Sequence, residues 1–191
     1  MPVRPSPAAR PLHAFRPTSG TAVGIAGVVA AALVVVLVAV TERSLFGLRT
    51  AVVAALVGLL VWMVLLRPRA QAYADTLVLC NMASDTTIPL ASIDSVVVRH
   101  TLNVWVGERR YVCPGIGQST RTMLRSQSRT RSAATDEQNY ATFVETTIDD
   151  LARAARRDAQ GDQPPVRRRW AVAELLALAA LLIALGGSFL L

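Results

Sequence analysis

The sequence predicts an α+β membrane protein with three transmembrane helices and one small antiparallel β-roll, closed by an amphipathic helix, inserted before the third. Three observations carry this prediction: three long apolar runs, arginine clusters at the ends of those runs, and a central stretch in which apolar and polar residues alternate. The chain has 191 residues, of which 52% are hydrophobic. It therefore has room for about one compact domain beside its membrane segments.

The first apolar run covers residues 20–40 and follows a basic, proline-rich tail at residues 1–19. It contains no charged residue and falls within the roughly 17–25 residues that a helix needs to cross a bilayer. A signal peptide is the competing interpretation, but its apolar core has only about 7–15 residues and ends at a cleavage site. A second apolar run follows closely, which favours a retained span.

The second run, residues 51–66, is near the lower length limit unless Thr50 and the stem of Arg49 extend it. Residues 20–66 are thus expected to form a two-helix transmembrane hairpin. Gly20 and Gly24 in the first helix have the spacing of small residues that lets helices approach closely in lipid, and Ala51 and Ala55 repeat it in the second.

The third run, residues 170–191, is expected to be the third transmembrane helix, with Glu174 one turn inside it. Intramembrane carboxylates are often functional. Because this one lies so near the end of the run, the sequence favours contact with the headgroups or with Arg169.

The orientation follows from the arginines, because cytoplasmic flanks of membrane helices accumulate basic residues. The loop at residues 41–50 carries Arg43, Arg49 and Glu42 and is less basic than the other flanks, so it should face outward. The N-terminus and residues 67–160 then lie in the cytoplasm, and the C-terminus of this multi-pass inner-membrane protein lies outside. The basic residues on the three cytoplasmic flanks are Arg4, Arg10, Arg16, Arg67, Arg69, Arg167, Arg168 and Arg169.

The cytoplasmic segment, residues 67–160, contains four or five expected strands joined by short connections, which favours antiparallel pairing. Gly107 and Glu108 fit a two-residue hairpin turn that begins with glycine. Pro89 marks its strand as an edge strand or a bulge. The expected strands cover residues 73–80, 86–90, 95–101, 102–106 and 109–113, with Val96, Val98, Leu102, Val104 and Val106 on apolar faces.

A mobile Arg/Ser-rich loop is expected at residues 118–135, followed by an amphipathic helix at residues 136–157. Thr135 and Gln138 resemble a capping box at the helix start. A linker at residues 161–169 leads to the third apolar run. The expected apolar face of the helix consists of Tyr140, Phe143, Val144, Ile148, Leu151 and Ala155.

Several sequence stretches resemble a family. An apolar hairpin, then "RPRAQAYADTLVLCN", "IPLASIDSVVV" and "ERRYVCPGIG", then a helix and a further apolar run, is similar to the bacterial pleckstrin-homology-domain membrane proteins of actinobacterial type. The resemblance covers about residues 60–155 and implies a pleckstrin-homology-like roll in a membrane setting. Phosphoinositide-binding members use basic residues in the first strand-to-strand loop, whereas the matching loop here, residues 81–85, has Asp85 and no basic residue.

The sequence shows no catalytic constellation: its two histidines are His13, in the proline-rich tail, and His100, on an expected strand, and no glycine-rich phosphate loop appears. We therefore expect no enzyme and no cofactor. His100, Cys80 and Cys113 would make three zinc ligands if adjacent strands aligned them, but ordinary buried cysteines are favoured. The sequence leaves open whether the cysteines meet in space; if the domain faced outward, they could form a disulfide.

The net charge of +7 raises the question of nucleic-acid binding, but no aromatic residues interleave with the arginines, which argues against it. A run within residues 118–135 is a candidate leaflet-binding loop, with a solvated loop as the equal alternative. It consists of Arg121, Arg125, Arg129 and Arg131. Trp105 and Tyr111 either form a partner-binding surface or pack internally, and internal packing is favoured.

Two functional hypotheses follow. The leading one is a membrane-anchored, non-enzymatic interaction module whose cytoplasmic domain binds a protein partner, a second copy of the chain or the inner leaflet. The alternative is a subunit or regulator of a membrane transport or envelope-assembly complex that acts through its transmembrane helices.

Overall fold

The structure is a computed structural model that describes residues 11–15, 20–42, 44–99, 101–116, 131–159 and 163–189; for residues 131–138 it gives the helical backbone alone. The chain separates into two compact units. One, here named the β domain, contains Met1–Ser19 and Pro68–Arg169. The other, here named the helical unit, contains Gly20–Arg67 and Trp170–Leu191.

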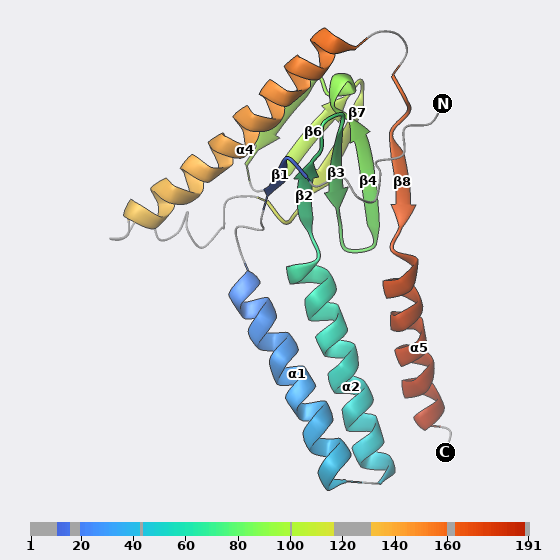
Figure 1. The fold of residues 1–191 in the computed structure, drawn as a ribbon. Coiled ribbons are helices and arrows are strands. Elements are labelled where there is room, and N and C mark those ends of the chain that lie inside the picture. The colour runs from blue at the N-terminus through green and yellow to red at the C-terminus, as the bar shows by residue number, and fades with distance from the viewer. Residues whose placement is uncertain are drawn as a thin grey trace. The chain divides into compact units, whose positions relative to one another are not determined.

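The helical unit contains three described helices, α1 (Thr21–Thr41), α2 (Leu45–Val61) and α5 (Val172–Ser188) (Figure 1). A π-helical turn, η1 (Trp62–Leu66), continues α2 without a break. α1 with 21 residues and α2 with η1 with 22 residues are each long and apolar enough to cross a membrane. The first span is thus confirmed as an apolar helix within one residue at each end.

The second helix begins at Leu45 rather than at residue 51. The hydroxyl of Ser44 accepts a hydrogen bond from the backbone N–H of Gly47 at 3.1 Å, which caps the helix nearly two turns earlier than the apolar run suggested. The expected loop at residues 41–50 therefore shrinks, and Arg49 lies inside the helix. Arg49 and Thr50, the residues that the sequence allowed as an extension, are helical, and the helix continues beyond them to Leu45 because Ser44 caps it there.

The third helix is shorter than expected. α5 has 17 residues, about 25 Å at 1.5 Å per residue, whereas the hydrocarbon core of a bilayer is about 30 Å thick. It begins at Val172 instead of residue 170, because Trp170 ends a strand. Residues 190–191 lie outside the described residues. The structure thus shows two apolar helices of spanning length and a third, shorter one.

The β domain contains a five-stranded antiparallel sheet, here named sheet A, in the order β1-β2-β3-β4-β8 (Figure 1). One row across four of its strands joins Phe15, Ala70, Leu79 and Thr86, and all four side chains are buried. This row faces the core. The strands are β1 (His13–Phe15), β2 (Arg69–Ala72), β3 (Thr76–Cys80), β4 (Ser84–Pro89) and β8 (Arg167–Trp170).

Sheet A corrects three expectations. Residues 13–15, expected in a tail, form an edge strand, because the ring of Phe15 is buried in the core with 3% of its surface exposed. The linker at residues 161–169 contributes β8. The strand expected at residues 73–80 begins only at Thr76, and the residues before it form the additional strand β2; a hydrogen bond from Tyr73 N to Thr76 O at 2.8 Å closes the turn between β2 and β3.

Pro89 does not mark an edge. It is the last residue of β4, and β4 lies between β3 and β8. A proline is accommodated there because the strand ends at it, so no further ladder hydrogen bond needs its missing N–H.

The second sheet, here named sheet B, has three antiparallel strands in the order β5-β6-β7. The expected strands at residues 102–106 and 109–113 are confirmed residue for residue, and Gly107 adopts the positive φ, 57°, that the turn requires. The expected inward residues Val96, Val98, Leu102 and Val104 are all buried. The strands are β5 (Ser95–Val98), β6 (Leu102–Val106) and β7 (Arg109–Cys113).

Helix α4 (Arg131–Asp158) packs against β5 and the 3₁₀ turn η2 (Leu90–Ser92). It begins at residue 131, so the expected loop at residues 118–135 ends earlier and Thr135 is no N-cap. Residues 117–130 lie outside the described residues. Two polar contacts hold the helix: Val98 N donates to Glu145 Oε2 at 3.1 Å, and Arg156 Nη1 donates to Ile93 O at 2.9 Å.

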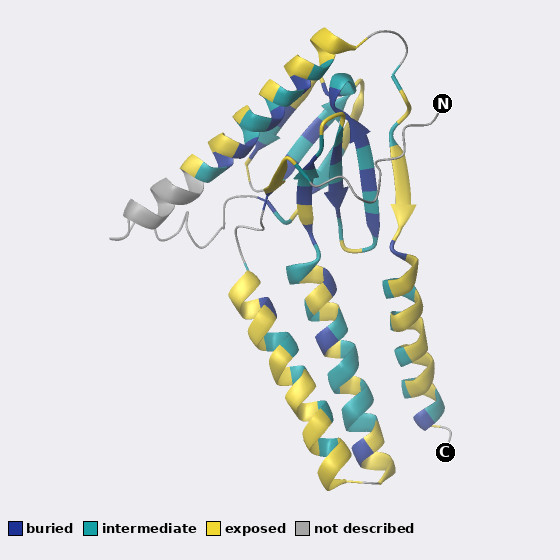
Figure 2. Cartoon of the chain, in the orientation of Figure 1, coloured by how far each residue is buried: buried dark blue, intermediate teal, exposed yellow. Residues whose placement is uncertain are grey.

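The predicted apolar face of α4 is confirmed in its centre and wrong at one position. Val144 and Ile148 are fully buried, whereas Phe143 is 52% exposed. Ala141 and Ala152, which the pattern overlooked, are buried instead. Figure 2 shows the buried residues along both sheets and along one side of α4. The β domain therefore closes one core between two sheets and a helix.

Candidate interaction surfaces

The first candidate feature is an ion pair within the helical unit. Arg67 Nε lies 3.1 Å from Glu174 Oε1, and the two side chains are 9% and 22% exposed. Arg67 follows the π turn, where its N–H donates to Trp62 O at 3.0 Å. The sequence located Glu174 correctly near a helix end and favoured contact with the headgroups or with Arg169; the structure instead pairs it with Arg67.

Arg49 makes a second polar contact within this unit. Its Nε and Nη2 donate to the carbonyl oxygen of Ser188 at 3.1 and 2.5 Å, and its guanidinium lies 4.8 Å from the ring centroid of Phe189. The arginine thus satisfies a carbonyl at the C-terminal end of α5, where helices leave such groups unpaired. No sequence pattern pointed to this contact, because it joins residues 139 positions apart.

Together the two arginines fix the direction of α5. Arg49 near the start of α2 meets the end of α5, and Arg67 beyond the end of η1 meets the first turn of α5. α5 therefore runs antiparallel to α2. Helices that cross a membrane in succession alternate in this way.

Small residues bring α1 and α2 close together. A side chain added at Gly20, Gly24 or Gly27 would lie about 3.0 Å from atoms of Leu65, Leu66 or Val61, and one added at Gly58 would lie 2.9 Å from Ala31. The expected role of Gly20 and Gly24 is confirmed. Gly27 and Gly58, which no sequence pattern singled out, continue the same contact between α1 and α2.

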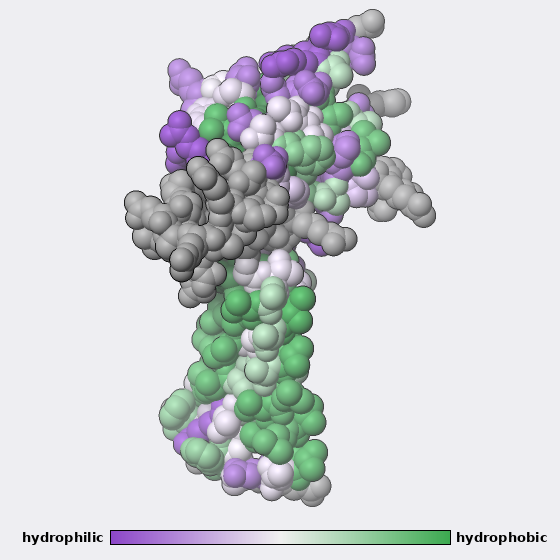
Figure 3. All heavy atoms as spheres, turned by 90° about the vertical axis from the view of Figure 1, so that its left-hand side faces the viewer, coloured by the Kyte–Doolittle hydropathy of each residue, from purple (hydrophilic) through white to green (hydrophobic). Residues whose placement is uncertain are grey.

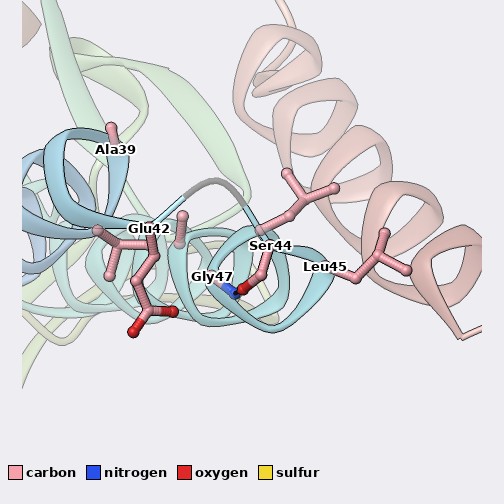
Figure 4. Close-up of a pocket in the computed structure, with 8 residues that line it drawn as sticks. Ala39, Glu42, Ser44, Leu45 and Gly47 are labelled. Atoms are coloured by element: carbon pink, nitrogen blue, oxygen red, sulfur yellow. Dashed lines mark hydrogen bonds between the residues drawn. The ribbon is translucent and has the colours of Figure 1, made fainter.

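An open pocket of about 430 Å³ lies between the end of α1 and the start of α2 (Figure 4). Its walls are mainly apolar or small, and its polar groups include the carboxylate of Glu42 and the hydroxyl of Ser44. That hydroxyl is already engaged in capping the helix. The lining residues therefore offer space for an apolar group beside one carboxylate. They are Val38, Ala39, Glu42, Ser44, Leu45, Gly47, Leu48 and Ala51.

The predicted membrane-flanking arginines of the β domain gather at one end of sheet A. The register places Arg69 opposite Cys80 and Cys80 opposite Asp85, and Arg168 Nε donates to the hydroxyl of Ser84 at 3.0 Å. Arg69 and the arginines of β8, Arg167, Arg168 and Arg169, are exposed. The sequence assigned Arg69 and the three arginines of β8 to two separate membrane flanks. The strand register places both groups at the same end of sheet A.

The outer face of sheet B carries Trp105. The register places Trp105 directly opposite Arg110, and Val97, Asn103 and Val112 form the neighbouring row. Arg110 is exposed and the other four are half-buried. Tyr111 packs against the core, as favoured, whereas Trp105 belongs to the outward face of the sheet. Tryptophan beside arginine is a composition that protein interfaces favour.

A groove of about 300 Å³ lies within the β domain beside the C-terminal part of α4. Alanines form much of its lining, and Asp75 and Asp158 are its carboxylates, both exposed. Its lining residues include no histidine, cysteine or lysine.

The two cysteines lie close together. The Sγ of Cys113 is 3.9 Å from the carbonyl oxygen of Cys80, both side chains are buried, and the two cysteines are not joined by a disulfide. Burial raises the pKa of the Cys113 thiol to about 11, with a smaller contribution from the nearby Cys80 and an opposing one from a backbone hydrogen bond at Gly115. The thiol is therefore protonated, and a poor nucleophile, at neutral pH.

Three predicted sites fall partly or wholly outside the described residues, and the first is the set of flanking arginines, of which Arg4, Arg10 and Arg16 are outside. His100, the third candidate zinc ligand, is outside them, and within the described parts of the chain no three histidine, cysteine or acidic side chains cluster as metal ligands. Arg121, Arg125 and Arg129 of the candidate leaflet-binding loop are also outside. Arg131 begins α4, and its side chain is not described.

Comparisons with protein-family models, with curated proteins and with solved structures found no match.

Proposed function

We propose that the protein is a membrane-anchored, non-enzymatic interaction module that presents the β domain to the cytoplasm, where it binds a protein partner or the inner leaflet. α1, α2 with η1, and α5 are its three spans in this proposal. The N-terminus lies inside and the C-terminus outside.

The observation that carries the proposal is the contrast in exposure between the two units. Large apolar side chains of α1 such as Val36, Leu37 and Val40 are 60%, 62% and 78% exposed, whereas Leu79 and Ile88 of the β domain are fully buried. Figure 3 shows hydrophobic surface over most of the helices in that view. Exposed apolar surface of this extent indicates a membrane or protein environment.

Packing supports the proposal that α1 is a retained span and that α5 is the third. The glycines of α1 lie against side chains of α2 and η1, so cleavage after α1 would remove a helix that packs closely on α2. α5 is short, but it runs antiparallel to α2 and is contacted by Arg49 at its end and by Arg67 in its first turn, which fits a third span. Local bilayer thinning accommodates short spans at modest cost.

The pleckstrin-homology-like character of the β domain belongs to the proposal. It is supported by the order of its elements, in which strands of one antiparallel sheet precede a three-stranded sheet and a closing helix. β1, which precedes α1 in the sequence, and β8, which lies between α4 and α5, extend this arrangement.

The sidedness is tested by introduced cysteines, because Cys80 and Cys113 are buried and would resist labelling on either side of the membrane. Glu42→Cys lies in the connection between α1 and α2, and Glu108→Cys lies in the β6–β7 turn; both positions are exposed. A membrane-impermeant maleimide should label Glu42→Cys in intact cells and Glu108→Cys only after permeabilisation. The reverse pattern would refute the orientation.

A second candidate function is supported by the ion pair. A simple anchor needs no ion pair between its helices, yet Arg67 and Glu174 form a part-buried one within the helical unit. Such contacts suit a subunit or regulator of a transport or envelope-assembly complex that acts through its helices.

Exchanging parts separates the two functions. One variant lacks residues 68–169, and a second keeps the β domain but carries unrelated spans; both are compared with the full chain by photo-crosslinking. Partners retained only by the variant without residues 68–169 would favour a function that acts through the helices. Partners retained only by the variant with unrelated spans would favour the interaction module.

A further inference from the structure

We propose that one end of sheet A binds the phosphate groups of anionic glycerophospholipids through Arg69 and the arginines of β8, Arg167, Arg168 and Arg169. This inference rests on the proposed membrane anchoring and adds to it the binding surface and the chemistry of the ligand. The surface is here named the arginine end.

The strand register builds the arginine end. Arg69 at the start of β2 lies opposite Cys80 at the end of β3, and Cys80 lies opposite Asp85 near the start of β4. β8 follows β4 in the sheet, and its Arg168 donates to Ser84. Residues separated by about a hundred positions in the sequence therefore share one end of a single sheet.

The arginines are presented by strands that the sheet holds in place. Ser84 is buried, with 3% of its surface exposed, so its hydroxyl is a fixed acceptor for Arg168 Nε. Successive side chains of a strand project to opposite faces, so Arg167 and Arg169 lie on the face opposite Arg168. Arginines held on a strand lose less conformational freedom on binding than those of a loop.

The charge and the chemistry match a phosphodiester. Four arginines and one nearby aspartate, Asp85, leave a net charge of about +3 at this end. A guanidinium pairs with two phosphate oxygens at once, which an ammonium does not do as well. The turn between β3 and β4 adds Met82, 38% exposed, as an apolar group suited to the level of the acyl chains.

The position of these arginines in the chain favours a lipid ligand over a soluble one. Arg69 comes three positions after Leu66, the last residue of η1, and Arg169 comes three positions before Val172, the first residue of α5. If α2 and α5 cross a membrane, the chain enters and leaves the β domain through these arginines. Basic residues next to a span meet the anionic surface of the leaflet.

Hydrogen–deuterium exchange of the full chain in nanodiscs tests the proposal. Nanodiscs of phosphatidylcholine alone are compared with nanodiscs that also contain phosphatidylglycerol. We expect phosphatidylglycerol to slow amide exchange in the β3–β4 turn and along β8, and to leave the β6–β7 turn unchanged. The double variant Arg167→Gln/Arg169→Gln should lose most of this effect, since each arginine near an anionic surface contributes about fivefold in affinity.

The matched control is Arg109→Gln/Arg110→Gln, which removes two exposed arginines from β7 and the same amount of charge. It should keep the phosphatidylglycerol effect. Equal exchange in both kinds of nanodisc, or equal loss in both variants, would overturn the proposal. Neither result bears on the membrane anchoring, which has its own test. If alkaline carbonate extracted the chain from membranes, the anchoring would be refuted.

Discussion

The β domain and the helical unit bury their apolar residues in different ways. In the β domain the apolar side chains of two sheets and α4 meet in one core, and the largest of them are fully buried. In the helical unit the buried residues include glycines, and the large apolar side chains of α1 point outward. The β domain is thus organised by removing apolar surface from water, whereas the helical unit is organised by close backbone approach and a few polar contacts.

This difference predicts which substitutions will change the stability of each region. In the β domain, stability resides in side-chain volume. In the helical unit, it resides in the absence of side chains at the α1–α2 seam and in the partners of two arginines.

The largest expected effect comes from one substitution made in both regions. Leu79→Ala removes a fully buried side chain from the core, whereas Leu37→Ala removes one that is 62% exposed. We expect Leu79→Ala to lower the free energy of unfolding of the β domain by about 4 kcal/mol, because it leaves a cavity. Leu37→Ala should leave it unchanged. Urea titration of the full chain in detergent, followed by amide exchange in β3, measures both.

The pH dependence of the β domain should follow Cys113. Its pKa is raised from 9.0 to about 11 in the folded state. Above pH 9 the unfolded thiol loses its proton while the folded one keeps it, so the free energy of unfolding falls between pH 9 and 11. The loss amounts to about 3 kcal/mol, since one pKa unit corresponds to 1.36 kcal/mol.

The control for this prediction is Cys113→Ala, which removes the titrating group. The difference in unfolding free energy between the two proteins should change over this pH interval, and amide exchange in β7 measures it. A difference that stays constant from pH 8 to 11 would contradict the assignment to Cys113.

In the helical unit the polar contacts should matter most. Glu174→Ala leaves Arg67 without its carboxylate, and we expect the three-helix packing to lose about 2 kcal/mol, at the upper range of polar contacts between membrane helices. The double variant Glu174→Ala/Arg67→Leu should recover part of this loss. SDS titration in bicelles gives the free energies, and additive single effects would mean that the pair is not coupled.

The sequence predicted those elements whose signal is local. α1 is a continuous apolar run, β6 and β7 alternate regularly, and Gly107 begins their turn, so all of these appear where expected. β1 was missed because three residues are too few to show a period. β8 was missed because its residues, three arginines and a tryptophan, carry no apolar alternation and are all exposed.

The candidate surfaces show the same limit. The sequence identified the arginines at the flanks, since clustered charge is visible in one dimension. It did not assign Arg67 to Glu174, Arg49 to Ser188 or Arg168 to Ser84, because each contact joins residues more than eighty positions apart. Such pairs follow from strand register and helix direction, which local pattern does not determine.

The smallest expected effect again contrasts the two regions through one substitution. A Cβ added at Gly107 or at Gly187 meets no atom within 4 Å, so neither Gly107→Ala nor Gly187→Ala produces a clash. Gly107 has a φ of 57°, which alanine adopts only at a cost, so Gly107→Ala should destabilise the β domain by about 1 kcal/mol. Gly187 is helical, so Gly187→Ala should stabilise α5 by up to about 1 kcal/mol. Opposite signs in amide exchange of β7 and α5 are expected, and equal signs would mean that space, rather than backbone conformation, decides the outcome.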